Sequence, residues 1–277
     1  MNRTERPEGN DPLTPYEQAL RHRVPSREAL LAEAKAQTAR QRRTKQTLGA
    51  GLSLLLLAGA LWTIDPAWRS EDVRTAAGQR DSLQLADGSR IILNSATHLR
   101  IEQRLRSRQI ELLVGEATFT VVHAAKPFIV RSQGTKVLDI GTVFNVRSDS
   151  RGVAVAVIEG AVQVSTAQSP AQRLHGDQQV LVSGDRLGRI TSGDSTRATA
   201  WQQGKLRFDG TPLRDVIADI QRYRQAPISL RDTGIGELRV SGEFDSAAVE
   251  SLIDLLPAIL PVMVSRGGDG GVVVSGR

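Results

Sequence analysis

Histidines and carboxylates are the side chains in this sequence that could bind a metal or transfer protons, and their spacing favours neither activity. The four histidines fall in separate segments without HExxH or similar ligand spacing, so we expect them in surface or packing roles. They are His22, His98, His123 and His175. Three glutamates lie among predicted strands, where we expect solvated carboxylates. They are Glu102, Glu111 and Glu116. The absence of cysteine excludes disulfides, Cys–metal sites and Cys nucleophiles.

Two glycine-rich segments could hold a phosphate group, and neither has the required pattern. Gly234-Ile235-Gly236 lacks the third glycine of a dinucleotide loop and opens no predicted helix, and the GxxxxGK[ST] motif is absent. Residues 267–271 are typical of a hairpin turn. We therefore expect no cofactor and no metabolic reaction. A hydrolase or a polysaccharide-binding β-protein would instead require an apolar pocket with convergent titratable groups.

The net charge of +6 is concentrated before an apolar segment rather than on the main body. Residues 1–46 hold ten Lys/Arg and six Asp/Glu, residues 47–64 hold none, and the remaining residues hold 26 and 24. A nucleic-acid-binding body usually has a concentrated basic face, so this distribution argues against one. It suits a short basic tail beside a membrane.

Residues 47–64 (TLGAGLSLLLLAGALWTI) predict a transmembrane helix. This uncharged run makes about 27 Å of helix, against a hydrocarbon core of about 30 Å. Basic residues precede it and acidic residues follow it, so the N-terminus is expected in the cytoplasm. The basic residues that form this topology signal are Arg40, Arg42, Arg43 and Lys45, and the acidic ones are Asp65, Glu71 and Asp72.

Other interpretations of the N-terminal part are open. Arg42-Arg43 before an apolar run is also typical of a twin-arginine export signal, in which Ala58-Gly59-Ala60 would be a cleavage site that releases a soluble periplasmic protein. The segment could also be a buried core helix. In the tail, Ser26 is predicted to cap an Ala-rich helix that runs into the apolar segment. The tail itself is either a topology signal alone or a segment that orders on a partner.

Residues 72–191 predict an all-β domain without helices. Short apolar–polar alternations recur every 8–12 residues or so, and Asp87-Gly88 and Glu159-Gly160 mark tight turns. Strands are predicted around 83–85 and 91–93, and at 109–114, 118–122, 128–131, 137–140, 143–147, 153–158 and 161–165, with 180–182 and 189–190 closing the set. This pattern is typical of a sandwich, a roll or a solenoid-like stack.

Residues 192–200 are polar and predict a linker, and residues 201–277 predict a small α+β module. The module's order is βαββαββ, from strands at 205–208, 228–230, 238–241, 262–264 and 272–274. Its two amphipathic helices are predicted to begin with Thr211-Pro212 and with Asp245 or Ser246 as caps. This order predicts helices on one side of a small sheet. The fold is thus expected to be mainly β, with one transmembrane helix and an α+β end.

Several segments after residue 72 carry a family resemblance. They are LQLADGSRIILNSATHLRI (83–101), GEATFTVVHAAKPFIV (115–130), DIGTVFNV (139–146), VAVIEGAVQV (155–164), WQQGKLRFDGTPLRDVIADIQRYR (201–224) and LRVSGEF (238–244). In this order they resemble FecR-like regulators, the inner-membrane anti-sigma sensors of iron-uptake signalling. The module 201–277 is similar to the short STN domain shared by secretins and TonB-dependent receptors.

The resemblance implies a single-pass protein of the bacterial inner membrane with a periplasmic body. The periplasmic signalling domain of a TonB-dependent receptor, which responds to an iron chelate or haem, would engage residues 201–277. Residues 1–46 would bind an extracytoplasmic-function sigma factor, and periplasmic and intramembrane proteases would act on the chain. Family members usually have a longer N-terminal domain with Trp-containing helices, so a reduced anti-sigma region is expected here. The alternative is an exported periplasmic β-domain binding protein without a sigma partner.

Some FecR-like regulators resemble self-cleaving proteins at a Gly-Thr step, and DIGTVFNV contains Gly141-Thr142. In an N→O acyl shift the Thr142 hydroxyl would attack the Gly141 carbonyl, and water would then open the ester without a cofactor. The simpler hypothesis, which we favour for their main role, is structural: Gly141 turns the chain and Thr142 begins a core strand.

Overall fold

A computed structural model describes residues 26–277 of the chain. Residues 1–25 lie outside the described residues, as do the side chains at positions 39–48 and 50. The predicted topology signal, Arg40, Arg42, Arg43 and Lys45, therefore lies on a described helix but outside the described side chains. The chain divides into two compact units that meet at the bond between Ile64 and Asp65.

Helix α2 (Arg27–Ile64) joins the end of the tail and the apolar segment in one helix of 38 residues. Ser26 caps it, as predicted: its hydroxyl accepts a hydrogen bond from the Ala29 N–H at 3.2 Å. The described side chains at 49 and 51–64 are exposed. Across the side chains that the structure describes, no helix combines the length and apolar character needed to cross a membrane.

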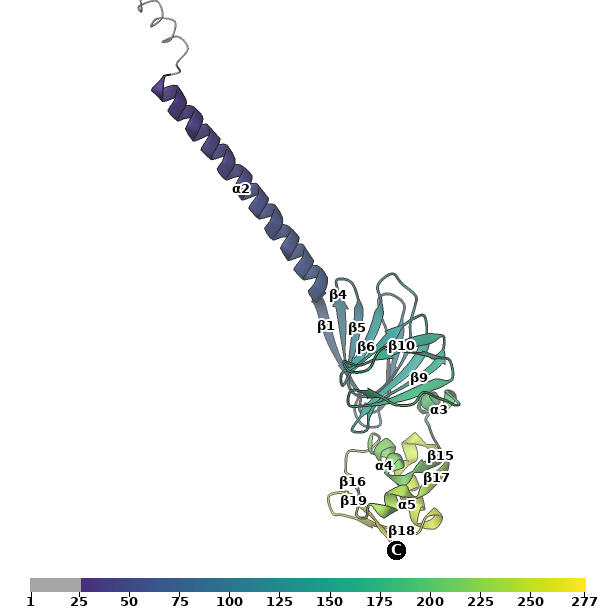
Figure 1. The fold of residues 1–277 in the computed structure, drawn as a ribbon. Coiled ribbons are helices and arrows are strands. Elements are labelled where there is room, and N and C mark those ends of the chain that lie inside the picture. The colour runs from purple at the N-terminus through teal and green to yellow at the C-terminus, as the bar shows by residue number, and fades with distance from the viewer. Residues whose placement is uncertain (1–25) are drawn as a thin grey trace, which may run out of the picture. The chain divides into compact units, whose positions relative to one another are not determined.

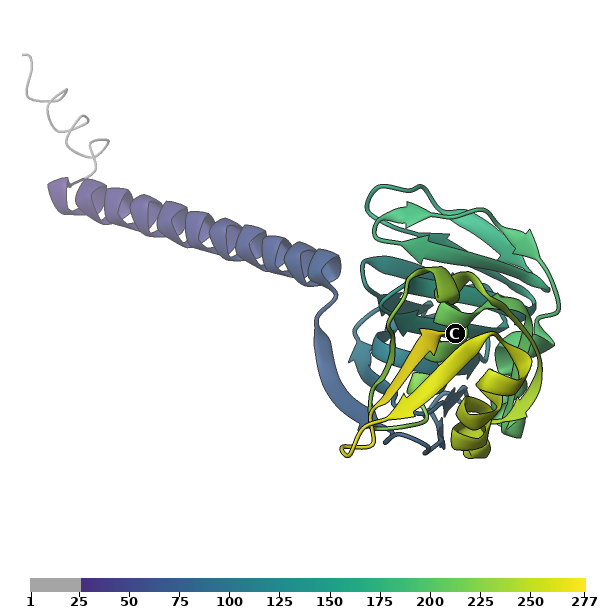
Figure 2. The same cartoon turned by 90° about the horizontal axis from the view of Figure 1, so that it is seen from below.

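The unit from Asp65 onward begins with two β-sheets that share one long strand, β5 (Arg108–Thr120) (Figures 1 and 2). The first sheet runs β1-β4-β5-β6-β7-β10-β11, and the second runs β2-β3-β5-β8-β9-β12 with β13 and β14 beside β12. All pairs are antiparallel except β5 with β6. The other strands are β1 (Ala67–Arg74), β2 (Asp81–Gln84), β3 (Arg90–Leu93), β4 (His98–Arg104), β6 (Phe128–Ser132), β7 (Thr135–Asp139), β8 (Val143–Asp149), β9 (Gly152–Glu159), β10 (Ala161–Ser165), β11 (Gln172–His175), β12 (Gln178–Ser183), β13 (Arg186–Leu187) and β14 (Thr191–Ser192).

Gly115 allows β5 to pass from one sheet into the other. Its φ is +101°, and an added Cβ would lie 2.5 Å from the Cα of Thr97, so only glycine fits there. Before this residue β5 pairs with β4 and β6, and after it with β3 and β8. The change of partners presents Glu116, the next residue, at the junction of the two sheets.

Apolar side chains from both sheets fill one core. Phe128 of the first sheet and Phe144 of the second both pack on Phe119 of the shared strand, with ring centroids 6.0 Å and 5.1 Å apart. All three are fully buried. Such aromatic contacts hold the sheets together at their shared strand.

The predicted all-β character of this domain is confirmed, with differences in detail. The strands predicted at 109–114 and 118–122 are one strand, since Gly115 bends β5 without ending it. Strands β1, β4 and β11 were not predicted, because polar and charged residues dominate them and β1 buries almost nothing. The strand predicted at 189–190 is wrong: β12 is followed instead by the short strands β13 and β14.

The C-terminal module has the predicted βαββαββ order, but its strands form two sheets rather than one. Strands β15 (Lys205–Pro212) and β17 (Arg239–Asp245) form one sheet, and β16 (Ile228–Leu230), β19 (Val272–Gly276) and β18 (Val262–Arg266) form the other. Helix α4 (Leu213–Gln221) contacts strands of both sheets, as does α5 (Val249–Ile259). A one-sided layer was the wrong expectation, because apolar residues on both helices and both sheets meet in one core.

The caps and the predicted linker also differ in part. Pro212, not Thr211, is the residue before α4, and it is still part of β15. Asp245 does cap the short turn before α5, accepting from the Ala247 N–H at 2.8 Å. Residues 192–200 contain the helical turn α3 (Thr196–Thr199) and lead into a 3₁₀ turn in which Trp201 is buried. This segment therefore contains regular structure, while most of its residues are exposed.

Candidate functional site: a buried polar network between the β domain and the C-terminal module

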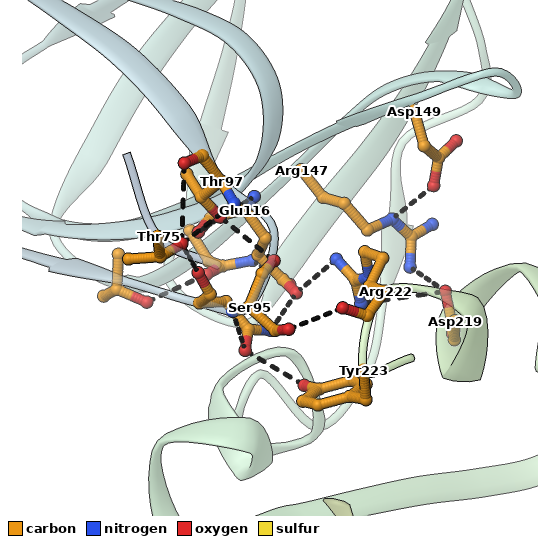
Figure 3. Close-up of polar contacts among 12 residues, drawn as sticks. Thr75, Ser95, Thr97, Glu116, Arg147, Asp149, Asp219, Arg222 and Tyr223 are labelled. Carbon is orange, nitrogen blue, oxygen red and sulfur yellow. Dashed lines mark hydrogen bonds and ion pairs between the residues drawn. The ribbon is translucent and has the colours of Figure 1, made fainter. Parts of the chain in front are cut away.

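Glu116 is the centre of a buried polar network (Figure 3). Its side chain is 6% exposed, and its carboxylate accepts hydrogen bonds from the amides of Asn94 at 2.8 Å and Asn145 at 2.9 Å. The guanidinium Nη1 of Arg222 donates to it at 2.7 Å. Because Glu116 follows the bend at Gly115, its carboxylate reaches residues of both neighbouring strands and of the module. The expectation of a solvated carboxylate is wrong for this residue.

The two residues that follow helix α4 connect the module to the Glu116 carboxylate and its neighbours. The helix ends at Gln221, so the next two side chains leave its axis toward the β domain (Figure 3). Arg222 reaches Glu116, and its carbonyl accepts a hydrogen bond from the Ser95 hydroxyl at 2.5 Å. The Tyr223 hydroxyl lies 3.0 Å from Oδ1 of Asn94. Two of these contacts fix the end of α4 against the loop after β3, and the third fixes it to Glu116 on β5.

A second cluster of charges lies beside the first. The tip of the β8–β9 hairpin carries Arg147, Asp149 and Arg151, and helix α4 contributes Asp219. The Arg151 Nη2 donates to Asp149 at 2.5 Å and to Asp219 at 2.7 Å. Arg147 Nη1 donates to Asp219 at 3.3 Å, and Nη2 of Arg222 lies 3.8 Å from the same carboxylate oxygen. Asp219 therefore joins the two clusters.

Burial and neighbouring opposite charges shift the pKa values of these groups in opposite directions. Burial alone would lower the pKa of Arg222, but the charges of Glu116 and Asp219 outweigh it and raise the pKa. Arg151 behaves likewise, with its pKa raised by Asp149 and Asp219 despite burial. Burial would raise the pKa of the Asp149 carboxyl, but the hydrogen bond from Arg151 and the charge of Arg147 lower it. Arg222, Arg151 and Asp149 are therefore held in their charged forms.

Tyr223 is the exception, because it is held neutral. Burial raises its pKa to about 12, although the charge of Arg222 acts in the opposite direction. A neutral hydroxyl suits its contact with the Asn94 amide. The charge pairs and hydrogen bonds of the network attach the module noncovalently to the β domain.

A cleft of about 460 Å³ opens beside the network, between the second sheet and the module. Its walls come from β8, β9, β15 and α4 and from the segment around Trp201. Two buried donors that line it, Trp201 Nε1 and Arg222 Nε, make no hydrogen bond with the described residues. Trp201 is held through its carbonyl, which accepts from Arg80 at 2.6 Å. Within the described residues no group of three His, Asp or Glu side chains could hold a metal.

Comparison with known proteins identifies the β domain. Residues 71–163, about a third of the chain, match the FecR protein family. This segment of the chain is FecR-like. Two crystal structures of a candidate anti-sigma factor from Parabacteroides distasonis, at 1.65 Å and 2.50 Å resolution, are similar to it over 75% and 76% of this chain and 99% and 100% of theirs. Both share 27% sequence identity with it at a TM-score of 0.67. No curated protein matches the chain closely.

The network spans the boundary of the FecR match. Glu116, Asn145 and Arg151 lie within residues 71–163, whereas Asp219 and Arg222 come from the module beyond it. The FecR domain of this chain is therefore fastened to its C-terminal module by charges that each part supplies.

The residues predicted from sequence lie elsewhere. Gly141 and Thr142 form the turn between β7 and β8, where Gly141 has a φ of +88° and Thr142 is 4% exposed. The Thr142 hydroxyl donates to a carboxylate oxygen of Asp139, whose other oxygen accepts from the Gly141 N–H at 2.9 Å. Of the histidines, His98 lies 2.8 Å from Asp72 across β1 and β4.

Sequence reasoning missed the network because its members are far apart in the chain. Glu116 alone left a signal: it is a charged residue in the otherwise apolar stretch LLVGEATF, directly after a glycine. A carboxylate in such a run is buried only if donors surround it. Its partners, at positions 94, 145 and 222, have no common spacing.

Proposed function

We propose that this FecR-like protein is an anti-sigma regulator that passes a signal from the periplasm to an extracytoplasmic-function sigma factor. The observation that carries the proposal is the FecR match at residues 71–163, together with similarity to a candidate anti-sigma factor over almost all of that protein's length. In this proposal residues 1–46 contact the sigma factor, and the chain has no metabolic activity. Proteases of the periplasm and the membrane would release the tail.

The proposal places residues 47–64 across the bacterial inner membrane, with the N-terminus in the cytoplasm. The sequence supports this topology, since the segment has no charged residue and the basic residues before it would remain in the cytoplasm. A reporter enzyme fused after residue 70 should be active only outside the cytoplasm, and the full-length chain should sediment with membranes. A soluble product that begins near Leu61 would instead support a cleaved export signal.

The proposed partner of the module is the periplasmic signalling domain of a TonB-dependent receptor for an iron chelate or haem. The module offers places for a partner strand, since among the described residues β15 and β17 each pair with a single strand. An extended segment can add to such an edge. Deletion of residues 201–277 should abolish ligand-dependent induction and leave membrane insertion intact, and normal induction by this truncated chain would contradict the receptor contact.

Binding by the tail is the decisive experiment for the sigma factor. Residues 1–46, fused to a carrier protein, should capture an extracytoplasmic-function sigma factor from the same cell, and the carrier alone should not. A tail that captures no sigma factor, in a chain that still reaches the periplasm, would favour an exported β-domain binding protein. A chain that fails to insert would contradict the topology instead.

A second candidate activity is self-cleavage between Gly141 and Thr142, which the contact of the Thr142 hydroxyl with Asp139 favours. The carboxylate of Asp139 would take the hydroxyl proton as Oγ1 bonds to the Gly141 carbonyl carbon. The C–N bond would then break, the Thr142 nitrogen would leave as an amine that takes up a proton, and water would hydrolyse the ester. The two pieces would remain associated through the paired strands β7 to β10.

Self-cleavage predicts two bands on a denaturing gel of purified protein, with a new N-terminus at Thr142. Thr142→Ala should remove the doublet, and Asp139→Asn should slow its appearance. Thr142→Ser, which keeps a hydroxyl, should preserve it. A single full-length band from the wild type after long incubation with protease inhibitors would refute this activity.

A further inference from the structure

The tip of the β4–β5 hairpin, residues 104–108, is fastened to the residue that follows helix α2. The Asp65 carboxylate accepts hydrogen bonds from the Arg106 N–H and from the Ser107 hydroxyl, both at 2.6 Å. The Asp65 carbonyl accepts another from Arg104 Nη1 at 3.0 Å. Three contacts therefore hold Asp65 on the hairpin tip.

The connection between helix α2 and strand β1 is very short. Only Asp65 and Pro66 lie between the end of α2 and the start of β1. Strand β1 then pairs with β4 from Ala67 beside Arg104 to Arg74 beside His98, with one irregularity at Trp68 (Figure 1). Consecutive Cα atoms are about 3.8 Å apart, so Asp65, which the hairpin tip holds, lies one such step from Ile64, the last residue of α2.

Large apolar side chains are exposed at this tip. Leu105, at the turn of the hairpin, is 52% exposed, and Trp68 is 66% exposed. Trp68 lies at an irregularity in the β1–β4 pairing, opposite the last residues of β4. Tryptophan is a residue typical of the membrane–water interface.

Most of the charges around these two residues are paired, and Lys126, which lines the same hollow as Trp68, has no ion pair among the described residues. The Arg104 guanidinium lies 2.7 Å from Glu102, and Arg108 forms an ion pair with Asp87. The carboxylate of Asp65 faces Arg106. Paired charges give the tip little net attraction for anionic groups. A partner of this surface would therefore bind mainly to the apolar side chains of Leu105 and Trp68.

We propose that the hairpin tip, through Leu105 and Trp68, rests in the interfacial layer of the lipid bilayer that residues 47–64 cross. This inference rests on the proposed membrane span and adds a second contact with the same bilayer.

Single cysteines test this contact cleanly, because the chain has no cysteine of its own. A spin label would be attached at Leu105→Cys in the full chain, reconstituted in vesicles of phosphatidylethanolamine and phosphatidylglycerol. Leu181→Cys, at an exposed leucine of β12, is the matched control, and Leu55→Cys reports on the apolar helix. The measurement compares the accessibility of each label to oxygen, which enriches in lipid, and to a water-soluble nickel chelate.

The label at residue 105 should be several-fold more protected from the nickel chelate than the label at 181, and less protected than the label at 55. High salt should leave this order unchanged, because the contact is apolar. If residue 55 is in lipid but residue 105 matches residue 181, the tip contact is overturned and the span is retained. If residue 55 also matches residue 181, the proposed span itself fails, and the tip contact with it.

Discussion

The ion pair between Glu116 and Arg222 gives the sharpest test of how the module is held. The N–O distance is 2.7 Å and the side chains are only 6% and 13% exposed. Arg222→Met removes the guanidinium and leaves a buried carboxylate with two amide donors. Breaking a buried pair from one side costs about 3–5 kcal/mol, since the remaining charge is unpaired. We expect Arg222→Met to lower the free energy of unfolding by that amount.

The chain offers a matched control at the same distance. Arg207 and Glu243 also lie 2.7 Å apart, but their side chains are 39% and 44% exposed. An exposed pair contributes about 0–1 kcal/mol, because water and salt screen it. Arg207→Met makes the same substitution and should lower the free energy of unfolding by no more than this.

Urea unfolding followed by fluorescence can measure both variants. Trp201 is buried beside the network, so a background in which Trp62 and Trp68 are replaced by Phe makes the fluorescence change on unfolding report on Trp201. The double variant Glu116→Gln with Arg222→Met should lose less stability than the sum of the single variants, because no unpaired charge remains. Equal losses from Arg222→Met and Arg207→Met would refute the reasoning.

Three further predictions concern single residues. In a Tyr16→Phe chain Tyr223 is the only tyrosine, and its phenolate absorbance should rise near pH 12 rather than near pH 10. Because a raised pKa favours the protonated folded state, stability should fall by up to about 2.7 kcal/mol between these pH values, and Tyr223→Phe should abolish that fall. Gly115→Ala should lower the free energy of unfolding by roughly 2–5 kcal/mol in thermal unfolding, because of its positive φ and the clash with the neighbouring backbone. Gly88 is the control, since it has a φ of +87° and room for a Cβ, and Gly88→Ala should cost about 1–2 kcal/mol. Equal losses from the two variants would contradict the clash. The pKa of Asp149 is lowered in the folded protein, so Asp149 contributes stability above the ordinary carboxyl pKa and loses that contribution as the pH falls through its lowered pKa. Asp149→Asn should therefore flatten the decline of unfolding free energy in acid. An unchanged slope would count against its ion pairs.

Local periodicity predicted the elements of the module better than their arrangement. The apolar face of α4 appears in the sequence as Leu213, Val216, Ile217 and Ile220, and all four are buried. The division of the strands into two sheets depends on which strands pair, and pairing is decided by contacts between distant segments. The sequence therefore predicted a βαββαββ order, but could not predict which strands form each sheet.

In the β domain, too, the local sequence pattern did not predict strands whose residues are mostly polar. Strand β1 has one half-buried residue, Val73, so no apolar alternation marks it. It exists because β4 provides a paired backbone edge along its length. Gly115 was present in the sequence, but its meaning depends on Thr97, which lies 2.5 Å from where a Cβ would be.

Stability alone does not account for an ion pair at the junction of the two parts, because well-packed apolar side chains at such a place are often equally stable or more so. The pair does impose a condition that apolar packing would not. If α4 moves away, Glu116 keeps two amide donors but loses its counter-charge, while Arg147 and Arg151 lose Asp219. If Glu116 remained buried among its amide donors in the open form, its unpaired charge would cost about 3–5 kcal/mol, a factor of roughly 150–5,000 in the population of that form. A partner that opens the junction must therefore bind the open form more tightly than the closed form by a comparable factor. In the proposed regulator, this requirement keeps the module closed until a partner of sufficient affinity engages it.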